Sequence, residues 1–446
     1  TPLYSSAASD VYKRQFQGAD LEKRDAVQPA WLANAGKPLL MTLEEQNQVG
    51  MRLASDGKIQ FFDAQSMEAL TTIDLPLPAG TEVVSVGEDQ PGSHRVALGL
   101  SNGQALVFEH AYRITYPDDV KTITPSIVYP FGEAPLTIDP QGRPLEHMGI
   151  SVNSGTLLIA GSVGSELQVL SLSREENMMT GEVEVSEERL ALPQIAEPIK
   201  ELIIEPRQHW LFVINGRATA DVFDLRAKAL NGRYKLLNDG AREVTHVTSL
   251  LGGISLLIGD SAGGISQWFM VRDEDGKSDL KQVREFKMAD SPVSQIIPEE
   301  RRKGFIALDE KGNLGIFHST AHRTLLVEPV AEGHSIAALS PRANRVLVEA
   351  NGKIERILVD NPHPEISWSS LWGKVWYENY DKPEYVWQST SASTDAEPKL
   401  SLAPLAFGTL KAAFYAMLLA APLAIAAAIY TAVSYTHLTL PTNREV

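Results

Sequence analysis

The stretch "SLLIGDSAGGISQWFMV" (255–271) can be interpreted in two incompatible ways. Its "GDSAG" fits the G-x-S-x-G pattern of the esterase nucleophile elbow, with Ser261 as the nucleophile. The same letters fit a tight turn between two apolar strands. An elbow needs a helix directly after its serine, whereas "ISQWFMV" (265–271) is β-branched and aromatic, which is typical of a strand. No HGGG-type oxyanion loop lies upstream, so the stretch predicts a hairpin.

The same layout occurs seven times along the chain. Each copy has an apolar strand, a polar turn with a glycine, and a second apolar strand. The copies are 49–64, 95–110, 156–172, 210–225, 255–271, 304–319 and 345–360. Their turn glycines are Gly57, Gly103, Gly164, Gly216, Gly264, Gly312 and Gly352. Asp-Gly and Asn-Gly turns supply the positive φ angles that short hairpins require, so each copy predicts a β-hairpin.

The spacing of these hairpins predicts the architecture. A period of roughly 40–60 residues with several strands in each interval is typical of propeller blades. The strands are apolar on both faces, as expected where neighbouring sheets cover both sides. We therefore predict an all-β fold, a seven-bladed β-propeller over residues 16–361, which resembles WD-repeat propellers. Six or eight blades are the alternatives, because 156–172 matches least well. The last blade lacks an obvious fourth strand after Asp360, and residues 16–30 are the candidate for closing the ring.

Three irregular segments interrupt the repeats. Residues 116–144 are rich in proline and predict an outer strand of the second blade followed by an excursion loop. The acidic runs 175–189 and 272–281 are interpreted as solvated loops between blades. The triplet Asp273, Glu274 and Asp275 offers carboxylates to a calcium ion, but it lacks the spacing of an EF-hand loop. A solvated loop is therefore preferred there.

Composition excludes several classes of function. The 446 residues carry a net charge of −16 with no lysine- or arginine-rich block, which argues against a nucleic-acid partner. No cysteine is present, so disulfides and thiolate metal sites are excluded, and no P-loop motif occurs. His318 and His322 are four residues apart on a strand-and-turn segment, where they do not converge, and we interpret both as surface residues. We therefore expect no catalytic, cofactor-binding or metal-binding residues, no cofactor and no enzyme activity.

The composition changes after the last repeat. Residues 368–387 contain four of the seven tryptophans, which predicts either a buried docking surface or an interfacial aromatic belt. Residues 412–433 carry no charge and span roughly 30 Å as a helix, the thickness of a bilayer core. This favours the belt and a transmembrane helix. Lys399 and Lys411 lie at its N-terminal edge, and Pro422 predicts a kink within it.

The C-terminal stretch "LSLAPLAFGTLKAAFYAMLLAAPLAIAAAIYTA" (400–432), preceded by "LWGKVW" (371–376), resembles the permease subunit of phosphate-type, binding-protein-dependent ABC importers. The resemblance implies that the propeller is a large insertion between the first two transmembrane helices. Residues 362–400 would then be a juxtamembrane segment and linker, and 401–433 the first part of the permease domain. The implied partners are the membrane, a second permease subunit, an ATPase subunit and a periplasmic substrate-binding protein. The implied location is the bacterial inner membrane, with the propeller on the periplasmic side as a binding or docking domain.

Two further expectations concern the ends of the chain and its class of function. The ends 1–15 and 434–446 resemble translated sequencing adapters, so we expect them to be non-native and the rest to be a fragment. The alternatives to a truncated permease are a membrane-anchored propeller scaffold and a propeller enzyme. An enzyme needs catalytic or cofactor residues gathered at the central channel, and the sequence shows no such set.

Overall fold

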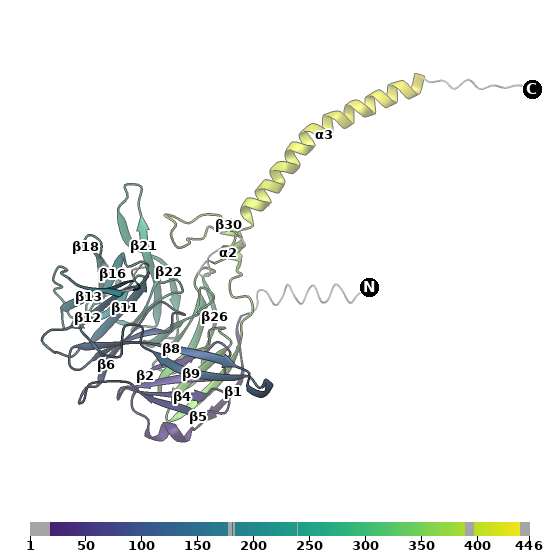
Figure 1. Ribbon diagram of the computed structural model, residues 1–446. Coiled ribbons are helices and arrows are strands. Elements are labelled where there is room, and N and C mark those ends of the chain that lie inside the picture. Colours follow the sequence, from purple (N-terminus) through teal and green to yellow (C-terminus); the bar gives the residue numbers. More distant parts are fainter. Residues whose placement is uncertain (1–17, 177–180, 182, 239, 389–396, 438–446) are drawn as a thin grey trace, which may run out of the picture.

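The computed structural model describes residues 18–176, 181, 183–238, 240–388 and 397–437. Seven antiparallel sheets follow one another along the chain, and a long helix leaves the assembly (Figure 1). The first strands of neighbouring sheets contact one another around a common centre, and each later strand lies further out. The predicted seven-bladed β-propeller is therefore confirmed.

The blades consist of the following strands. Blade 1 contains β2 (Pro38–Leu43), β3 (Val49–Ala54), β4 (Lys58–Asp63) and β5 (Ala69–Asp74). Blade 2 contains β6 (Val83–Glu88), β7 (Arg95–Leu100), β8 (Gln104–Thr115), β9 (Thr122–Val128) and β10 (Leu136–Thr137). Blade 3 contains β11 (His147–Asn153), β12 (Thr156–Val163), β13 (Glu166–Glu176) and β14 (Val183–Leu190). Blade 4 contains β15 (Ile199–Ile204), β16 (Trp210–Asn215), β17 (Thr219–Asp224) and β18 (Ala229–Lys235).

The remaining blades follow the same order. Blade 5 contains β19 (Val244–Ser249), β20 (Leu256–Asp260), β21 (Gly264–Arg272) and β22 (Ser278–Lys287). Blade 6 contains β23 (Val293–Pro298), β24 (Gly304–Asp309), β25 (Asn313–His318) and β26 (Arg323–Pro329). Blade 7 contains β27 (His334–Leu339), β28 (Arg345–Ala350), β29 (Lys353–Asp360) and β1 (Asp20–Val27). Two short 3-10 helices, η1 (Ala30–Asn34) and η2 (Pro117–Asp119), lie in connections.

The ring is closed by its N-terminal strand, as predicted for residues 16–30. β1 pairs antiparallel with β29, with Asp20 opposite Asp360 and Val27 opposite Ile354. The outermost strand of the last blade thus comes from the start of the chain, which joins the two ends of the repeat array.

All seven predicted hairpins are the second and third strands of a blade. Two of the predicted glycines do not supply the positive φ of their turns, although Gly216 lies in its turn. In blade 4 the left-handed residue is Ala218 (φ 56°) rather than Gly216, and in blade 5 it is Gly263 (φ 83°) rather than Gly264. A Cβ atom on Gly263 would lie 2.0 Å from the carbonyl oxygen of Ala289, so only glycine fits this turn.

The irregular segments fall partly where the sequence predicts them. Strand β9 pairs with the outer half of β8, and β10 pairs with its beginning, so the proline-rich segment adds strands to blade 2 as expected. The acidic runs are not loops between blades, which corrects the prediction. Residues 175–176 and 183–189 belong to β13 and β14, and residues 272–281 form the turn between β21 and β22 with parts of both strands.

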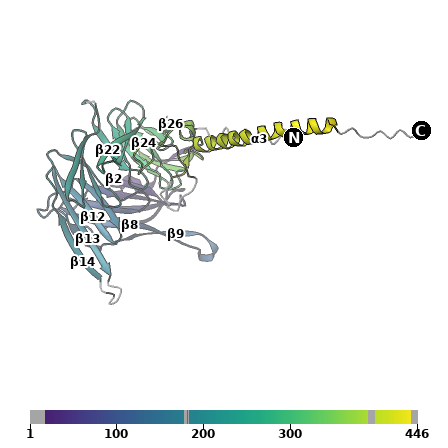
Figure 2. The same ribbon diagram turned by 90° about the horizontal axis from the view of Figure 1, so that it is seen from above.

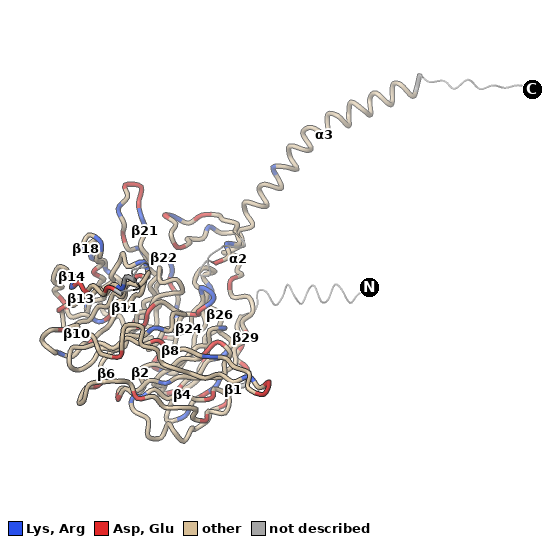
Figure 3. Tube along the Cα trace, in the orientation of Figure 1, with Lys and Arg blue, Asp and Glu red and all other residues tan. Residues whose placement is uncertain are grey.

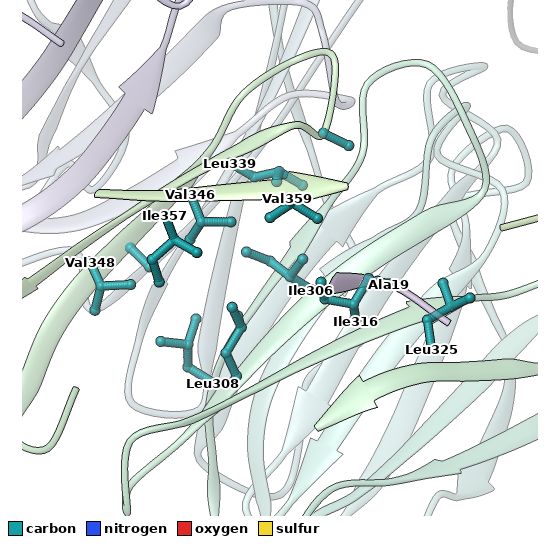
Figure 4. Packing of buried hydrophobic residues seen from close by; sticks show 13 residues of the cluster. Ala19, Ile306, Leu308, Ile316, Leu325, Leu339, Val346, Val348, Ile357 and Val359 are labelled. Atoms are coloured by element: carbon teal, nitrogen blue, oxygen red, sulfur yellow. The ribbon is translucent and has the colours of Figure 1, made fainter. Parts of the chain in front are cut away.

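Apolar layers between adjacent blades form the core. Figure 4 shows the layer between blades 6 and 7, where Ile306 and Ile316 lie in one cluster with Val346 and Ile357. Each blade is covered on both sides, which explains why its middle strands are apolar on both faces.

The C-terminal elements lie to one side of the ring. They are α2 (Trp368–Trp372), the two-stranded sheet β30 (Trp387–Gln388) and β31 (Lys399–Leu400), and α3 (Ala403–His437). Helix α3 extends away from the propeller in both views (Figures 1 and 2) and continues through Pro422. Its residues Ala403–Tyr435 are long and apolar enough to cross a membrane, and none of the apolar window is buried.

Candidate functional site

The aromatic segment after blade 7 is docked on the propeller rather than free. We call residues 361–388 and 397–402 the strap. Its buried hydrophobic residues are Val375 and Tyr377, which are 6% and 2% exposed. A flexible linker would leave such side chains in water, so the strap is part of the folded domain.

A buried ion pair holds the centre of the strap. The Lys303 ammonium lies 2.5 Å from one Glu378 carboxylate oxygen and donates another hydrogen bond, of 2.5 Å, to the carbonyl oxygen of Leu251. The Ser255 hydroxyl donates to the second carboxylate oxygen at 2.5 Å. Because both charges are buried and fully partnered, the pair fixes where the strap crosses blades 5 and 6.

A second anchor lies beside this pair. The Arg284 guanidinium donates to the backbone oxygen of Trp376 at 2.6 Å and to the Gln267 side chain at 3.0 Å. Burial lowers the pKa of Arg284, and neighbouring carboxylates oppose that shift. The Trp376 ring meets Phe269 edge to face, with centroids 6.0 Å apart. The strap therefore packs through both polar and aromatic contacts.

Further contacts fix the two ends of the strap. The Ser367 hydroxyl donates to the Ala321 carbonyl oxygen at 2.9 Å and also caps α2. The Arg302 guanidinium donates to the Asn361 carbonyl oxygen at 2.8 Å. The Thr320 hydroxyl donates to the Glu397 carboxylate. The strap is thus held along its described length.

These contacts all fall on one face of the ring. In an antiparallel blade, the loops after the first and third strands share one face, and those after the second and fourth strands share the other. Leu251, Ser255, Arg302, Lys303 and Ala321 lie in or beside loops of the first kind. We call this side the strap face and the opposite side, which carries the seven hairpin turns, the open face.

The other part of the aromatic segment is exposed. Trp368, Trp372, Tyr385 and Trp387 are 69%, 46%, 45% and 43% exposed. The sequence offered a docking surface or a belt as alternatives and favoured the belt. The structure divides the segment, because Trp376 and Tyr377 pack on the propeller while these four side chains contact solvent.

The centre of the ring contains a polar channel. Its cavity of about 220 Å³ is lined by residues from the first strands of all seven blades. Polar side chains among the lining residues include Thr42, Glu88, Glu201, His246 and Gln295. The channel is therefore not a purely apolar core.

Enclosure by the protein shifts the titration of these groups. Burial, reinforced by Glu300, raises the pKa of Glu88 to about 7, although its side chain contacts solvent inside the channel. Burial, reinforced by Glu88, raises the pKa of Glu201 to about 8. Burial lowers the pKa of His246 to about 4. Near neutral pH the channel therefore holds a neutral histidine and carboxyls that retain much of their protons.

These channel residues were missed by the sequence analysis, which found no polar set there. A signal exists: Glu201, His246 and Gln295 occupy equivalent positions, two residues after the start of the first strand in three successive blades, each following a bulge. The closed ring decides which face of each innermost strand points to the centre. The hairpin pattern alone therefore does not identify the channel residues.

Ser261 lies in a turn, as predicted. It connects β20 and β21, and its hydroxyl oxygen accepts a 3.0 Å hydrogen bond from the Glu243 backbone N–H. Strand β21 follows directly, in place of the helix that a nucleophile elbow requires.

The histidine prediction is half correct. His322 is exposed, and its Nε2 lies 2.8 Å from the Glu285 carbonyl oxygen. His318 is buried, which corrects the surface interpretation, and its Nδ1 accepts from the Ala321 N–H. Burial and nearby arginines lower the pKa of His318 to about 3.

No cluster of three or more potential ligands that could hold a metal occurs among the described residues. The triplet Asp273, Glu274 and Asp275 is an exposed turn, closed by the Gly276 N–H donating to the Asp273 carbonyl oxygen. An Asp273 carboxylate oxygen accepts from the Lys277 N–H at 2.7 Å. The solvated interpretation of this triplet therefore fits the geometry.

Comparisons with known proteins identify the fold. The β-propeller domain of Cps50 (Swd1) from Myceliophteria thermophila matches 77% of this chain and all of that domain, with 11% identity and a TM-score of 0.50. Raptor from Chaetomium thermophilum matches 80% of this chain and 30% of its own, with 16% identity and a TM-score of 0.52. The fold is that of a WD40-like propeller. No family model and no curated protein matches the sequence, so the permease resemblance gains no support from these comparisons.

Proposed function

We propose that this chain is a membrane-anchored β-propeller that works as a non-enzymatic docking scaffold. Helix α3 crosses the bilayer, the strap fixes the propeller to it, and the open face binds a partner protein. A more specific proposal is that the chain is the permease subunit of an importer, in which case the docked partner is a transport complex.

The properties of α3 support anchoring. Within Ala403–Tyr435, Lys411 carries the one charged side chain, and large apolar residues such as Leu418 and Ile425 are more than half exposed. Figure 3 shows this contrast with the propeller, where positions of both charge signs are scattered along the trace. A helix whose apolar window is not buried by protein is stable in lipid rather than in water.

The docked strap is the observation that carries the proposal. A tethered but independent propeller would be joined to its anchor by a solvated linker. Instead, the Lys303–Glu378 pair and the Arg284–Trp376 contact hold the strap on the ring. At the start of the helix, the Leu402 N–H donates a hydrogen bond to the Leu371 carbonyl oxygen of the strap. A rigid joint gives the ring a fixed orientation relative to the bilayer, which a docking scaffold uses to present one face.

In this more specific proposal, the chain is a subunit of a phosphate-type importer in the bacterial inner membrane. It is supported by the resemblance of residues 400–432 alone. Its second permease subunit, ATPase and binding protein would then be the docked partners, with the propeller on the periplasmic side. The anchored scaffold does not depend on this identification.

Anchoring is tested with the full chain expressed in bacterial membranes. We expect it to resist alkaline carbonate extraction, and the double variant Leu418→Lys/Ile425→Lys to be extracted while keeping its β-rich circular dichroism. The variant should fold normally because both side chains are exposed. Complete extraction of the unmodified chain would contradict anchoring.

Docking is tested by photo-crosslinking in the same membranes. A photoreactive residue at exposed Lys311 or Lys353 on the open face should give a crosslinked product of one defined mass. The same residue at exposed Asp275, in a strap-face loop, is the matched control and should not give that product. Equal yields from both faces, or no product from either, would contradict an open-face scaffold.

A further inference from the structure

We propose that the exposed aromatic side chains of the strap lie in the headgroup layer of the bilayer. These are Trp368, Trp372, Tyr385 and Trp387, and we call them the collar. The inference rests on the proposed function, because it needs α3 to be inserted in lipid. It adds that the propeller itself contacts the membrane surface next to blades 5 and 6.

The collar surrounds the point where α3 leaves the strap. The Leu402 N–H, at the start of the helix, donates a 2.7 Å hydrogen bond to the Leu371 carbonyl oxygen in α2. Strand β31, which ends two residues earlier, pairs with β30 at Trp387–Leu400. Figure 1 shows α2 and β30 beside the base of the helix. Aromatic residues from two separate elements therefore gather where the chain approaches the bilayer.

The chemistry of the collar fits the interface better than it fits water. Tryptophan and tyrosine have an apolar ring and a polar N–H or O–H, and they concentrate at headgroup depth. The buried contacts of Tyr377 and Trp376 hold the strap, so the exposed rings are presented on a fixed frame.

The depth of the helix agrees with this placement. Ala403 to Lys411 rises about 12 Å, and the interfacial layer on each side is roughly 5–8 Å thick. A lysine side chain can extend about 5 Å along the helix to reach the interface, so the Lys411 Cα can lie inside the hydrocarbon core. The collar then lies about 7 Å above the core, within the headgroup layer.

The occupant is a neutral lipid interface rather than a specifically anionic one. The exposed charges near the collar have mixed signs, with Lys374 and Lys382 balanced in part by Asp381. The Lys374 ammonium lies over the Tyr385 ring, 5.7 Å from its centroid. Because the described residues beside the collar carry both lysines, including Lys399, and carboxylates, including Glu384, phosphatidylcholine alone should suffice and salt should have little effect.

The test uses the full chain in phosphatidylcholine vesicles with a fraction of brominated phosphatidylcholine, which quenches nearby tryptophan fluorescence. Bromines close to the headgroups should quench part of the emission, and that part should come from the collar. Trp368→Phe, Trp372→Phe and Trp387→Phe should each remove about one third of the lipid-quenchable signal, because they are the three collar tryptophans. Trp31→Phe and Trp268→Phe are matched controls and should remove none of it.

Each other outcome overturns the proposal in a recognisable way. If aqueous iodide quenches the collar tryptophans and brominated lipid does not, the collar stands in water above the membrane. If neither quencher reaches them, protein covers the collar, for example a second copy of this chain. Vesicle flotation separates these results from failure of the proposed function: a chain that does not float is not anchored, whereas a floating chain with an unquenched collar refutes the collar alone.

Discussion

The residues of the turn at 260–264, between β20 and β21, contribute unequally to its stability. The Asp260 carboxylate, 3% exposed, accepts hydrogen bonds from the N–H groups of Ala262 and Gly264 at 2.8 and 3.0 Å. Gly263 supplies the left-handed conformation, and Ser261 adds one partly solvated hydrogen bond. Asp260 therefore stabilises the turn, while Ser261 contributes little.

Ser261→Ala should change the free energy of unfolding by no more than about 0.5 kcal/mol, as is usual near the surface. Asp260→Ala removes the acceptor of two half-buried N–H groups and the ion-pair partner of Arg242, and should cost about 2 kcal/mol. Urea denaturation of the purified chain measures both. Rapid labelling of Ser261 by a fluorophosphonate probe would instead indicate a nucleophile and contradict the assignment of a turn.

The channel carboxyls make stability depend on pH. Glu88 and Glu201 have pKa values of about 7 and 8 in the folded protein, above the value of 4.5 that applies when the chain unfolds. Between about pH 4.5 and pH 8 the folded state therefore binds more protons than the unfolded state. The free energy of folding that the two carboxyls contribute is therefore fully present below about pH 4.5, and it is lost as the pH rises through 7 and 8.

Glu201→Gln removes one of these groups without changing the shape of its side chain. The variant should lose less stability than the unmodified chain between pH 5 and pH 8, by roughly 1–2 kcal/mol after screening by channel water is allowed for. Thermal unfolding at several pH values measures the slope. The exposed control Glu68→Gln should keep the original slope, and an unchanged slope in Glu201→Gln would show that this carboxyl is already ionised in the fold.

At the scale of elements, the strap stays docked on the propeller through only a few contacts. Strand β1 is held by a ladder along its whole length, whereas the strap has short strands and one turn of helix. Its position depends on the buried Lys303–Glu378 pair, whose side chains are 4% and 10% exposed. Removing one charge leaves the other buried and uncompensated, and undocking the strap relieves this at lower cost than unfolding a blade.

Lys303→Ala should therefore release the strap. We expect faster backbone hydrogen exchange over residues 375–384 and faster tryptic cleavage after the exposed Lys374, with little change in the unfolding of the blades. Lys277→Ala, which removes an exposed ion pair with Asp279, is the control and should change neither rate. Unchanged exchange in Lys303→Ala would mean that the apolar contacts alone hold the strap.

At the scale of the whole molecule, the seven blades and the strap give the ring two distinct faces. The strap face carries the anchor, and the open face carries the hairpin turns, including Lys311 and Gly352. If the collar rests on lipid, the open face points into the compartment on that side of the membrane. The permease resemblance makes this compartment the periplasm.

Accessibility to a membrane-impermeant reagent tests that orientation. The chain has no native cysteine, so a single cysteine at exposed Lys311 or Gly352 reports one site without background. Both positions should react with an impermeant maleimide in intact spheroplasts. Gly352 has a φ of 72°, so Lys311→Cys is the less strained of the two. Labelling only after lysis would place the propeller in the cytoplasm and refute the importer topology.

The sequence by itself determined the repeat, the number of blades and the apolar helix. These features depend on local chemistry: a turn with positive φ between two apolar strands, or an uncharged run long enough for a bilayer. The same reasoning placed the closing strand near residues 16–30, because the last blade lacked a partner for β29. It failed at Gly216 and Gly264, where a neighbouring residue takes the left-handed conformation.

Only the tertiary structure decided which side chains meet across the chain. Lys303 and Glu378 are separated along the chain by the six strands β24 to β29 and a blade boundary, and nothing in their local sequence marks them as partners. Glu88 and Glu201 share a channel only because the ring closes, and the split of the aromatic segment into a docked part and an exposed part depends on where blades 5 and 6 offer a surface. Long-range placement follows from packing of the whole ring, and a local pattern does not encode it.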